Sequence, residues 1–339
     1  MRESNRRYVF AKRPEGVPGK DVFELEENAV PDPGERQVLV RTVYLSVDPY
    51  MRGRMRDRES YAEPWDVGDP LKAAVIGRVV DSNYERLSEG DYVTGELDWA
   101  DYTVTDGDDL HPVDPDLAPL STYLGILGMP GRTAYFGLLE EAPPKPGDTV
   151  VVSGAAGAVG STVCQIASLN GCRVVGFAGS DTKIDYLEED LGIDAAINYK
   201  ETENYRDALD TVAPDGVDVY FDNVGGPITD AVFTNLNTDA RVAICGQIAH
   251  YNDESVPTGP RKLPQILPLR ATVSGFIVSD YAPRFQEATQ RLGEWVANGD
   301  LTYRETVTEG LENAPDAFLG LFEGENIGKQ LVKVTDPDE

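Results

Sequence analysis

Cysteine and histidine are scarce in this chain, and their scarcity limits its chemistry. Among 339 residues there are three cysteines (Cys164, Cys172 and Cys245) and two histidines (His111 and His250). No CxxC pair occurs, and no cysteine–histidine cluster has the spacing of a zinc site. A disulfide framework is therefore not expected, and two of the cysteines are interpreted as small core residues. We predict no metal site.

Long apolar runs and basic residues are also lacking. No run of about 18 apolar residues is present, so no membrane-spanning helix is predicted. The segment MRESNRRYVF has no apolar signal-peptide core, and we expect a cytoplasmic protein. The 59 acidic residues outnumber the 30 basic ones, for a net charge of −29. A field of this sign repels nucleic-acid phosphates and anionic lipids, so neither is an expected partner.

Lysine is rare even among the basic residues, since nine of the thirty are lysine. An acidic, lysine-poor, aspartate-rich composition resembles that of proteins from salt-loving microbes, where concentrated salt screens the self-repulsion. An acidic protein of an ordinary source is the alternative. The 41% hydrophobic content is that of a globular protein, and the length predicts about two domains.

The first part of the chain is predicted to be rich in short strands. Gln37–Val47 is apolar and β-branched, and Ala73–Val80 and Asp91–Val104 lie between glycine, aspartate and asparagine residues. Short strands at this spacing favour a small barrel or sandwich. Met129-Pro130-Gly131 is expected to break the chain before a helix at Thr133–Leu139.

Strands and helices alternate from Asp148 onward. Thr149–Ser153 is an uninterrupted β-branched run, as expected for a strand buried on both faces. The expected elements after it are helix Ala158–Asn170, strand Arg173–Phe177, helix Thr182–Asp190, strand Ala195–Asn198, helix Thr202–Val212, strand Val217–Phe221, helix Thr229–Leu236, strand Val242–Cys245, strand Thr272–Val278 and helix Pro283–Asn298. This repeated βαβ pattern predicts the α/β class with a doubly wound parallel sheet.

A glycine-rich turn joins the first of these strands to its helix. In Gly154–Gly160 (GAAGAVG) the first glycine allows a tight turn, Gly157 lets the backbone approach a pyrophosphate, and Gly160 lets the helix pack near the strand. The helix N-terminus offers N–H groups and positive dipole to the phosphates. Because the turn opens a repeated βαβ unit, we predict a dinucleotide site here rather than a purely structural contact.

The end of the second strand bears on the choice of dinucleotide. An NAD site carries Asp or Glu about 20 residues after the glycine turn, and Phe177–Ser180 contains neither. Lys183 is suited to pair with a 2′-phosphate, and Ser180 and Tyr199 are suited to add hydrogen bonds. Asp181 argues for NAD unless it caps the helix, and a solvated lysine is the alternative for Lys183. The balance favours NADP.

Six short motifs, in order along the chain, match the signatures of one family. They are Ser46–Arg52, Gly128–Tyr135, Ala155–Gly160, Phe221–Gly226, Ile244–Ile248 and Asn326–Lys329. The chain thus resembles the zinc-independent medium-chain dehydrogenase/reductases, in the group of prostaglandin reductases, leukotriene hydroxydehydrogenases and alkenal double-bond reductases. The resemblance implies a GroES-like domain (1–125), a Rossmann domain (126–300), a C-terminal return to the first domain (301–339), NADPH and a homodimer.

The resemblance also implies a cofactor site spread over several loops. Its expected residues are Gly157, Ala158, Val159, Gly160, Ser180, Lys183, Tyr199, Asn223, Cys245, Gly246, Gln247, Tyr251, Phe276, Ile277, Val278 and Asn326. Cys245 is expected to flank the site as a small residue and not as a nucleophile. The stretch Asn252–Arg270 departs from the family pattern where the family's substrate pocket is bordered, so the sequence does not specify the substrate.

The reaction implied by the resemblance is reduction of a carbon–carbon double bond conjugated to a carbonyl. Hydride transfer to the β-carbon gives an enolate, and the protein must orient the enone and hydrogen-bond the oxyanion. A neutral tyrosine suits the donor role. We expect Tyr251 to hold the nicotinamide ribose or the enolate oxygen and Tyr50 to line the substrate side, with His250 a weaker proton donor. The alternatives are a quinone reductase and a non-catalytic NADPH-binding protein.

Overall fold

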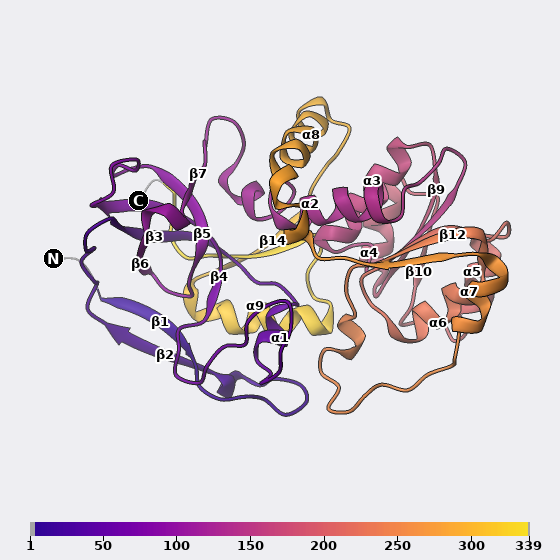
Figure 1. Cartoon of the computed structure of the whole chain (residues 1–339), viewed down its shortest axis with the longest axis horizontal. Helices are drawn as coiled ribbons and strands as arrows, with labels where there is room; N and C mark the ends of the chain where they lie inside the picture. Colours follow the sequence, from indigo (N-terminus) through magenta and orange to yellow (C-terminus); the bar gives the residue numbers. More distant parts are fainter. Residues whose placement is uncertain (1–3, 338–339) are drawn as a thin grey trace. The chain divides into compact units, whose positions relative to one another are not determined.

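The chain folds into two compact units, each assembled from separated pieces of sequence. The structure is a computed structural model that describes residues 4–337 (Figure 1). The first unit runs to Gly125 and also takes in Glu305–Asn326 and the stretch from Gln330. The second unit comprises Ile126–Arg304 and Ile327–Lys329.

The first unit is built mainly from antiparallel strands. Its elements are β1 (Asn5–Phe10), β2 (Phe23–Asn28), β3 (Gln37–Ser46), α1 (Met51–Arg54), β4 (Lys72–Ser82), β5 (Tyr92–Asp98), β6 (Tyr102–Asp106), β7 (His111–Pro112), β14 (Glu305–Glu309), α9 (Ala314–Glu323) and β15 (Lys329–Lys333). One sheet has the order β14-β15-β3-β4-β5-β7, with β6 also paired to β3, and β1 pairs with β2. The predicted strand Asp91–Val104 is in fact two strands, β5 and β6.

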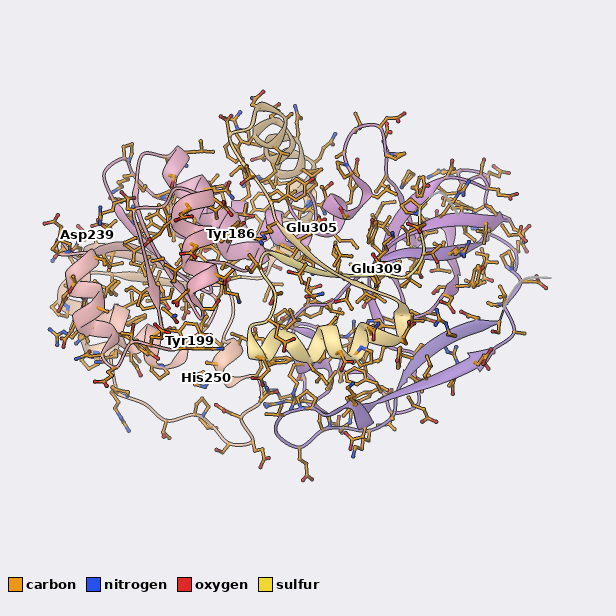
Figure 2. All side chains as sticks on the ribbon, turned by 180° about the vertical axis from the view of Figure 1, so that it is seen from behind. Tyr186, Tyr199, Asp239, His250, Glu305 and Glu309 are labelled. Atoms are coloured by element: carbon orange, nitrogen blue, oxygen red, sulfur yellow. The ribbon has the colours of Figure 1, made fainter. Side chains whose placement is uncertain are left out.

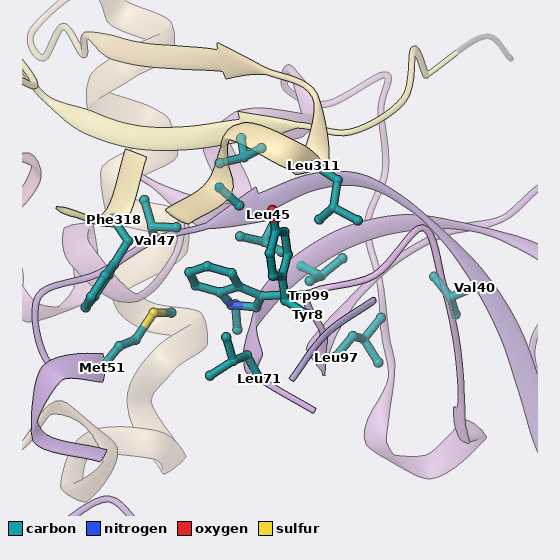
Figure 3. Close-up of a cluster of buried hydrophobic side chains, with 14 of the residues drawn as sticks. Tyr8, Val40, Leu45, Val47, Met51, Leu71, Leu97, Trp99, Leu311 and Phe318 are labelled. Carbon is teal, nitrogen blue, oxygen red and sulfur yellow. The ribbon is translucent and has the colours of Figure 1, made fainter. Parts of the chain in front are cut away.

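The core of the first unit surrounds the fully buried Trp99. Its ring stacks on Phe23 at a centroid distance of 5.9 Å and meets Phe318 of α9 edge-on at 6.3 Å (Figure 3). Leu311 and Phe318 come from the late part of the sequence, and β15 pairs with β3. Burial of such large aromatic side chains stabilises the unit and ties its late segment to its early strands.

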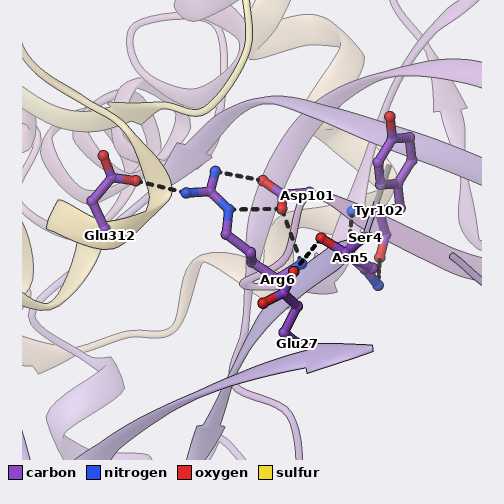
Figure 4. A network of polar contacts seen from close by, with 7 residues as sticks. All are labelled: Ser4, Asn5, Arg6, Glu27, Asp101, Tyr102 and Glu312. Atoms are coloured by element: carbon purple, nitrogen blue, oxygen red, sulfur yellow. Dashed lines mark hydrogen bonds and ion pairs between the residues drawn. The ribbon is translucent and has the colours of Figure 1, made fainter. Parts of the chain in front are cut away.

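A polar network anchors the same late segment. The Arg6 guanidinium donates two hydrogen bonds of 3.0 Å to the Asp101 carboxylate and one of 3.0 Å to Glu312 (Figure 4). The Arg6–Asp101 pair has the parallel two-bond geometry that makes such contacts specific. The network therefore joins β1, the β5–β6 connection and the segment before α9.

The second unit is a six-stranded parallel sheet with helices. Its strands are β8 (Thr149–Ser153), β9 (Arg173–Ala178), β10 (Ala195–Asn198), β11 (Val217–Asp222), β12 (Leu236–Ile244) and β13 (Thr272–Gly275). Their order is β10-β9-β8-β11-β12-β13, and all five pairings are parallel. This is the doubly wound order, in which successive strands are added on one side of β8 and then, from β11 onward, on its other side. The point between β8 and β11 is the topological switch point. The predicted α/β fold class is confirmed.

The helices of the second unit follow the strands as expected, with differences at their ends. They are α2 (Met129–Phe136), α3 (Ala158–Leu169), α4 (Asp181–Asp185), α5 (Tyr205–Val212), α6 (Gly226–Thr234), α7 (Leu263–Leu269) and α8 (Phe285–Asn298). The expected break at Met129-Pro130-Gly131 is wrong, because α2 begins there. Proline is tolerated in a first helical turn, and Gly131 packs so closely on the Ile126 carbonyl that a β-carbon would lie 1.8 Å from its oxygen. Within residues 4–337, no helix has the length and apolarity needed to cross a bilayer.

Candidate functional site

The glycine turn lies between β8 and α3 in the second unit. Gly157 is the N-cap of α3, and Ala158, Val159 and Gly160 form the first turn of that helix, which no side chain caps. A β-carbon at Gly160 would lie 2.3 Å from the Gly154 carbonyl oxygen and 2.8 Å from the Ala155 α-carbon. Gly160 therefore brings α3 against the turn, and the uncapped N–H groups fit a dinucleotide pyrophosphate.

Tyr199 and Lys183 lie beyond the carboxyl ends of β10 and β9. A β-carbon at Gly179 would lie 2.6 Å from the Tyr199 hydroxyl, so this ring lies directly over the backbone that precedes Ser180, the N-cap of α4. Burial raises the pKa of Tyr199, which keeps its hydroxyl protonated as a donor (Figure 2). Burial, and then the charge of Lys200, lower the pKa of Lys183.

The structure adds a second lysine, Lys200, to the predicted Lys183. Lys200 directly follows Tyr199, and its proximity to Lys183 concentrates positive charge in a chain of net charge −29. Asp181 does not cap α4, because its carboxylate accepts a 2.9 Å hydrogen bond from the Asn198 side chain. Two positive side chains that influence one another electrostatically, with Tyr199 directly before Lys200, suit a phosphate dianion.

Asn223 follows β11 at the topological switch point of the sheet, between β8 and β11. Its side-chain amide donates a 2.7 Å hydrogen bond to the Ser153 carbonyl, and its backbone N–H donates one of 2.9 Å to the Ser153 hydroxyl. Ligands of open α/β sheets bind at this switch point, outside the carboxyl ends of the strands. Asn223 therefore lies at the expected crevice.

The segment after β12 brings Cys245, Gly246, Gln247 and Tyr251 together. The Tyr251 hydroxyl accepts a 3.4 Å hydrogen bond from the Gln247 N–H and would lie 3.3 Å from a β-carbon at Gly246. Burial raises the pKa of Tyr251, so its phenol is neutral and able to donate near pH 7. Burial, followed by the charge of Asp222, raises the pKa of Cys245 to about 12, which makes it a poor nucleophile.

Three expected residues follow the edge strand β13. The ring of Phe276 meets Phe221 edge-on at 6.3 Å and would touch a β-carbon at Gly137. Ile277 and Val278 come next and are half-buried at the start of a 3₁₀ helix. Phe276 thus packs against β11, and Ile277 and Val278 continue the apolar segment after β13.

Asn326 and Tyr50 belong to the first unit. Asn326 is half-buried and directly precedes Ile327–Lys329, the short piece that the second unit takes up. Tyr50 stands at the N-terminus of α1 and packs on the core of the first unit. Burial, followed by the charge of Asp48, raises the pKa of Tyr50, so this phenol is also neutral near pH 7.

The two histidines differ in surroundings. The Nδ1 atom of His250 lies 2.8 Å from the Asp253 carboxylate, whereas His111 is exposed on β7. Across the described range 4–337, no three or more His, Cys, Asp or Glu side chains are placed to hold a metal ion.

Sequence reasoning missed Asp222, which is fully buried at the end of β11 and accepts hydrogen bonds from Ser153 and Gln247. The signal was present, since an acidic residue ended an otherwise apolar strand directly before Asn223. The sequence alone gives no means of counting the donors around it.

Comparisons with known proteins identify the family. A family described as the N-terminal domain of oxidoreductase matches residues 6–113, and one described as zinc-binding dehydrogenase matches residues 158–294. The chain is 46% identical to the NADPH-dependent curcumin reductase of Escherichia coli (100% of this chain, 99% of the relative). It is 41% identical to the NADP(+)-dependent 2-alkenal reductase of Nicotiana tabacum (98% of each).

A solved structure is similar along its full length. The crystal structure of CurA from Vibrio vulnificus in complex with NADPH matches with a TM-score of 0.93 and 43% identity, covering 98% of this chain and 100% of that one. Identity at this level over nearly the whole chain establishes common ancestry and common fold. The chain is an oxidoreductase that belongs to the medium-chain dehydrogenase/reductase family, in the group that includes curcumin, prostaglandin and 2-alkenal reductases.

Proposed function

We propose that this protein reduces the carbon–carbon double bond of α,β-unsaturated ketones and aldehydes, with hydride delivered to the β-carbon and without zinc. The observation that carries the proposal is the uncapped glycine turn at the start of α3, joined by Lys183, Tyr199 and Tyr251 in one unit. The relatives are named for reductions of this class.

The cofactor prediction, NADP, is confirmed by NADP-dependent relatives and by a similar structure with NADPH bound. When bound, NADPH supplies the hydride. We assign the pyrophosphate to Gly157–Gly160 and the 2′-phosphate to Lys183, Ser180 and Tyr199, with Lys200 adding charge. Asn223, the segment Cys245–Gln247, Phe276–Val278 and Asn326 are assigned to the rest of the cofactor.

The proton chemistry falls to the tyrosines in this proposal. Tyr251 donates a hydrogen bond to the enolate oxygen or to the nicotinamide ribose, and Tyr50 lines the substrate side. Both phenols have pKa values raised by burial, so they stay protonated through the neutral range and stabilise negative charge by donation. Zinc independence rests on the scarcity of cysteine and histidine ligands in the sequence.

The test is an assay of the purified chain with NADPH, in concentrated salt, against a panel of enones, enals and quinones. The expected result is loss of nicotinamide absorbance with enones and enals, much slower loss with NADH, and no effect of a chelator. Turnover confined to quinones would favour a quinone reductase, and NADPH binding without turnover would favour a non-catalytic protein. Loss of activity on chelation would contradict the zinc-free mechanism.

We also propose that the protein is a homodimer, joined through the edge strand β13. This strand ends the six-stranded sheet, and Val273 on it is 40% exposed. Leu263 and Leu267 on α7 are 77% and 83% exposed. An exposed edge with apolar neighbours is a pairing surface. The mass of the particle in solution tests the dimer, and Val273→Lys should yield monomers. The predicted cytoplasmic location stays a prediction.

A further inference from the structure

A buried carboxylate without a basic partner lies beneath the proposed cofactor site. Asp222 is 0% exposed at the end of β11. The side-chain partners of its carboxylate within residues 4–337 are hydrogen-bond donors, and none of them is a lysine, arginine or histidine. Burying an ionised carboxylate is costly unless hydrogen bonds replace its hydration. Such a group persists where its hydrogen bonds hold surrounding structure in one arrangement.

Six hydrogen bonds replace the lost hydration. On Oδ1 the donors are the hydroxyls of Ser153 (2.8 Å) and Tyr220 (2.9 Å) and the N–H groups of Val224 (3.0 Å) and Gly225 (2.9 Å), and on Oδ2 they are the Thr229 hydroxyl (2.7 Å) and the Gln247 amide nitrogen (2.9 Å). A carboxylate without its proton only accepts, and its two oxygens offer about four lone-pair sites, so the six surrounding donors are enough to occupy all of them. In Asp222→Asn the side-chain NH₂ group would direct its two N–H donors at the donors that now surround Oδ1 or Oδ2, so those hydrogen bonds would be lost.

Four of the six donors lie at the ends of three strands that the proposed site uses, whereas Tyr220 lies within β11 and Thr229 lies in α6. Ser153 ends β8, Val224 follows β11, and Gln247 follows β12. The Ser153 hydroxyl extends the network, because it also accepts from the N–H groups of Asn223 (2.9 Å) and Val224 (3.2 Å). The backbone carbonyl of Asp222 accepts from the N–H groups of Cys245 (2.8 Å) and Gly246 (3.0 Å). Asp222 thus connects the carboxyl ends of β8, β11 and β12 around the topological switch point.

We propose that Asp222 is a positioning residue for NADPH: its carboxylate holds Asn223 through Ser153 and holds Gln247 directly, in the arrangement that receives the cofactor. This inference rests on the cofactor site of the proposed function. Asp222 itself does not need to touch the cofactor. Asp222 acts through the loops that carry Asn223 and Gln247. Its loss should therefore weaken NADPH binding and raise the NADPH KM more than it lowers kcat.

The test compares variants that remove a matched hydrogen bond from the same carboxylate. Ser153→Ala removes a 2.8 Å hydroxyl donor that also orders Asn223, whereas Thr229→Val removes a 2.7 Å hydroxyl donor that comes from α6. NADPH dissociation constants are measured by fluorescence, with thermal midpoints recorded alongside. We expect Ser153→Ala and Asp222→Asn to weaken NADPH at least about tenfold, and Thr229→Val to leave it within about twofold.

Asp218→Asn is the control for general destabilisation. Asp218 lies on the same strand at the amino end of the sheet, where its carboxylate accepts from the Thr149 N–H (2.9 Å) and the Asn237 side chain (2.9 Å). It should lower the thermal midpoint and leave NADPH affinity unchanged. Amide hydrogen exchange should rise at 223–225 and 245–247 in Ser153→Ala and Asp222→Asn, but not in Asp218→Asn.

The outcomes separate the inference from the proposed function. Failure of the wild-type chain to bind NADPH would overturn both. Normal NADPH affinity in Asp222→Asn, or equal losses in Ser153→Ala and Thr229→Val, would overturn the positioning role alone. If Asp222→Asn does not fold, the Ser153→Ala and Thr229→Val pair still decides, because each removes one neutral donor and leaves the carboxylate in place.

Discussion

Replacing Gly157 or Gly160 by alanine should have different effects: the first should mainly weaken NADPH binding, and the second should mainly lower stability. At Gly160 a β-carbon would lie 2.3 Å from the Gly154 carbonyl oxygen, inside backbone that has no room to yield. At Gly157 the nearest atom is the same oxygen at 3.3 Å, and the backbone (φ −83°) suits any residue. Gly157→Ala therefore leaves the fold nearly intact, whereas Gly160→Ala must displace α3.

The magnitudes follow from these contacts. Overpacking at Gly160 should cost about 1–3 kcal/mol of stability. Gly157→Ala should cost about 0.5–1 kcal/mol, the usual penalty for alanine at an N-cap. If the pyrophosphate approaches Gly157, the added methyl should weaken NADPH about 10–100-fold, equivalent to about 1.4–2.8 kcal/mol. The ratio of affinity loss to stability loss should thus be large for Gly157→Ala and smaller for Gly160→Ala.

The assay pairs chemical denaturation with NADPH titration followed by fluorescence. Gly293→Ala in α8 is the matched control, because its β-carbon would meet only a Leu127 methyl at 3.8 Å. It should raise stability by about 0.5–1 kcal/mol and leave NADPH affinity unchanged. Wild-type affinity in Gly157→Ala would refute the assignment of the pyrophosphate to this turn, and wild-type stability in Gly160→Ala would refute the close packing of α3.

Four further predictions concern charge and proton donation. Lys183→Ala should weaken NADPH about 10–100-fold and leave NADH nearly unchanged, and equal losses would contradict phosphate recognition. Because burial, and then the charge of Lys200, lower the pKa of Lys183, its charge is lost earlier than that of an ordinary lysine as the pH rises. NADPH affinity should therefore fall with rising pH while NADH affinity stays level. Tyr251→Phe should lower kcat about 10²–10³-fold if the hydroxyl meets the enolate, or raise the NADPH KM if it meets the ribose, and a variant with neither change would exclude both roles. With a net charge of −29, the thermal midpoint should rise between 0.1 and 1 M KCl as the screening length falls from about 10 to about 3 Å, and a flat response would contradict salt adaptation.

The parallel sheet was the most predictable part of the molecule. β8 and β10 coincide with their predicted ranges, and α3 differs from its prediction by one residue, because buried β-branched runs and a glycine-bounded helix leave few alternatives. The family signatures then predicted which loops hold the cofactor. Confirmation of the family and fold does not extend to the individual site residues, which remain assignments to be tested.

The misses share a physical cause, which is that long-range packing decided the local structure. β2 has the sequence FELEEN, in which the apolar alternation stops after Phe23 and Leu25, and it forms a strand because β1 pairs along its whole length. α9 brings Phe318 to Trp99, a contact between residues more than two hundred positions apart. Lys200 and Asp222 were missed because their importance depends on neighbours from other strands, which one sequence does not reveal.

The turn at Gly157 is completed by a segment made much later. Gly157 forms a parallel β-bridge with Gly328, and the Gly328 N–H donates a 2.8 Å hydrogen bond to the Ala156 carbonyl. During synthesis the turn must therefore wait for 171 further residues before this contact forms. A nascent or prematurely terminated chain that lacks Gly328 cannot form this contact. The coenzyme is therefore expected to bind and stabilise full-length chains, and to stabilise incomplete chains little.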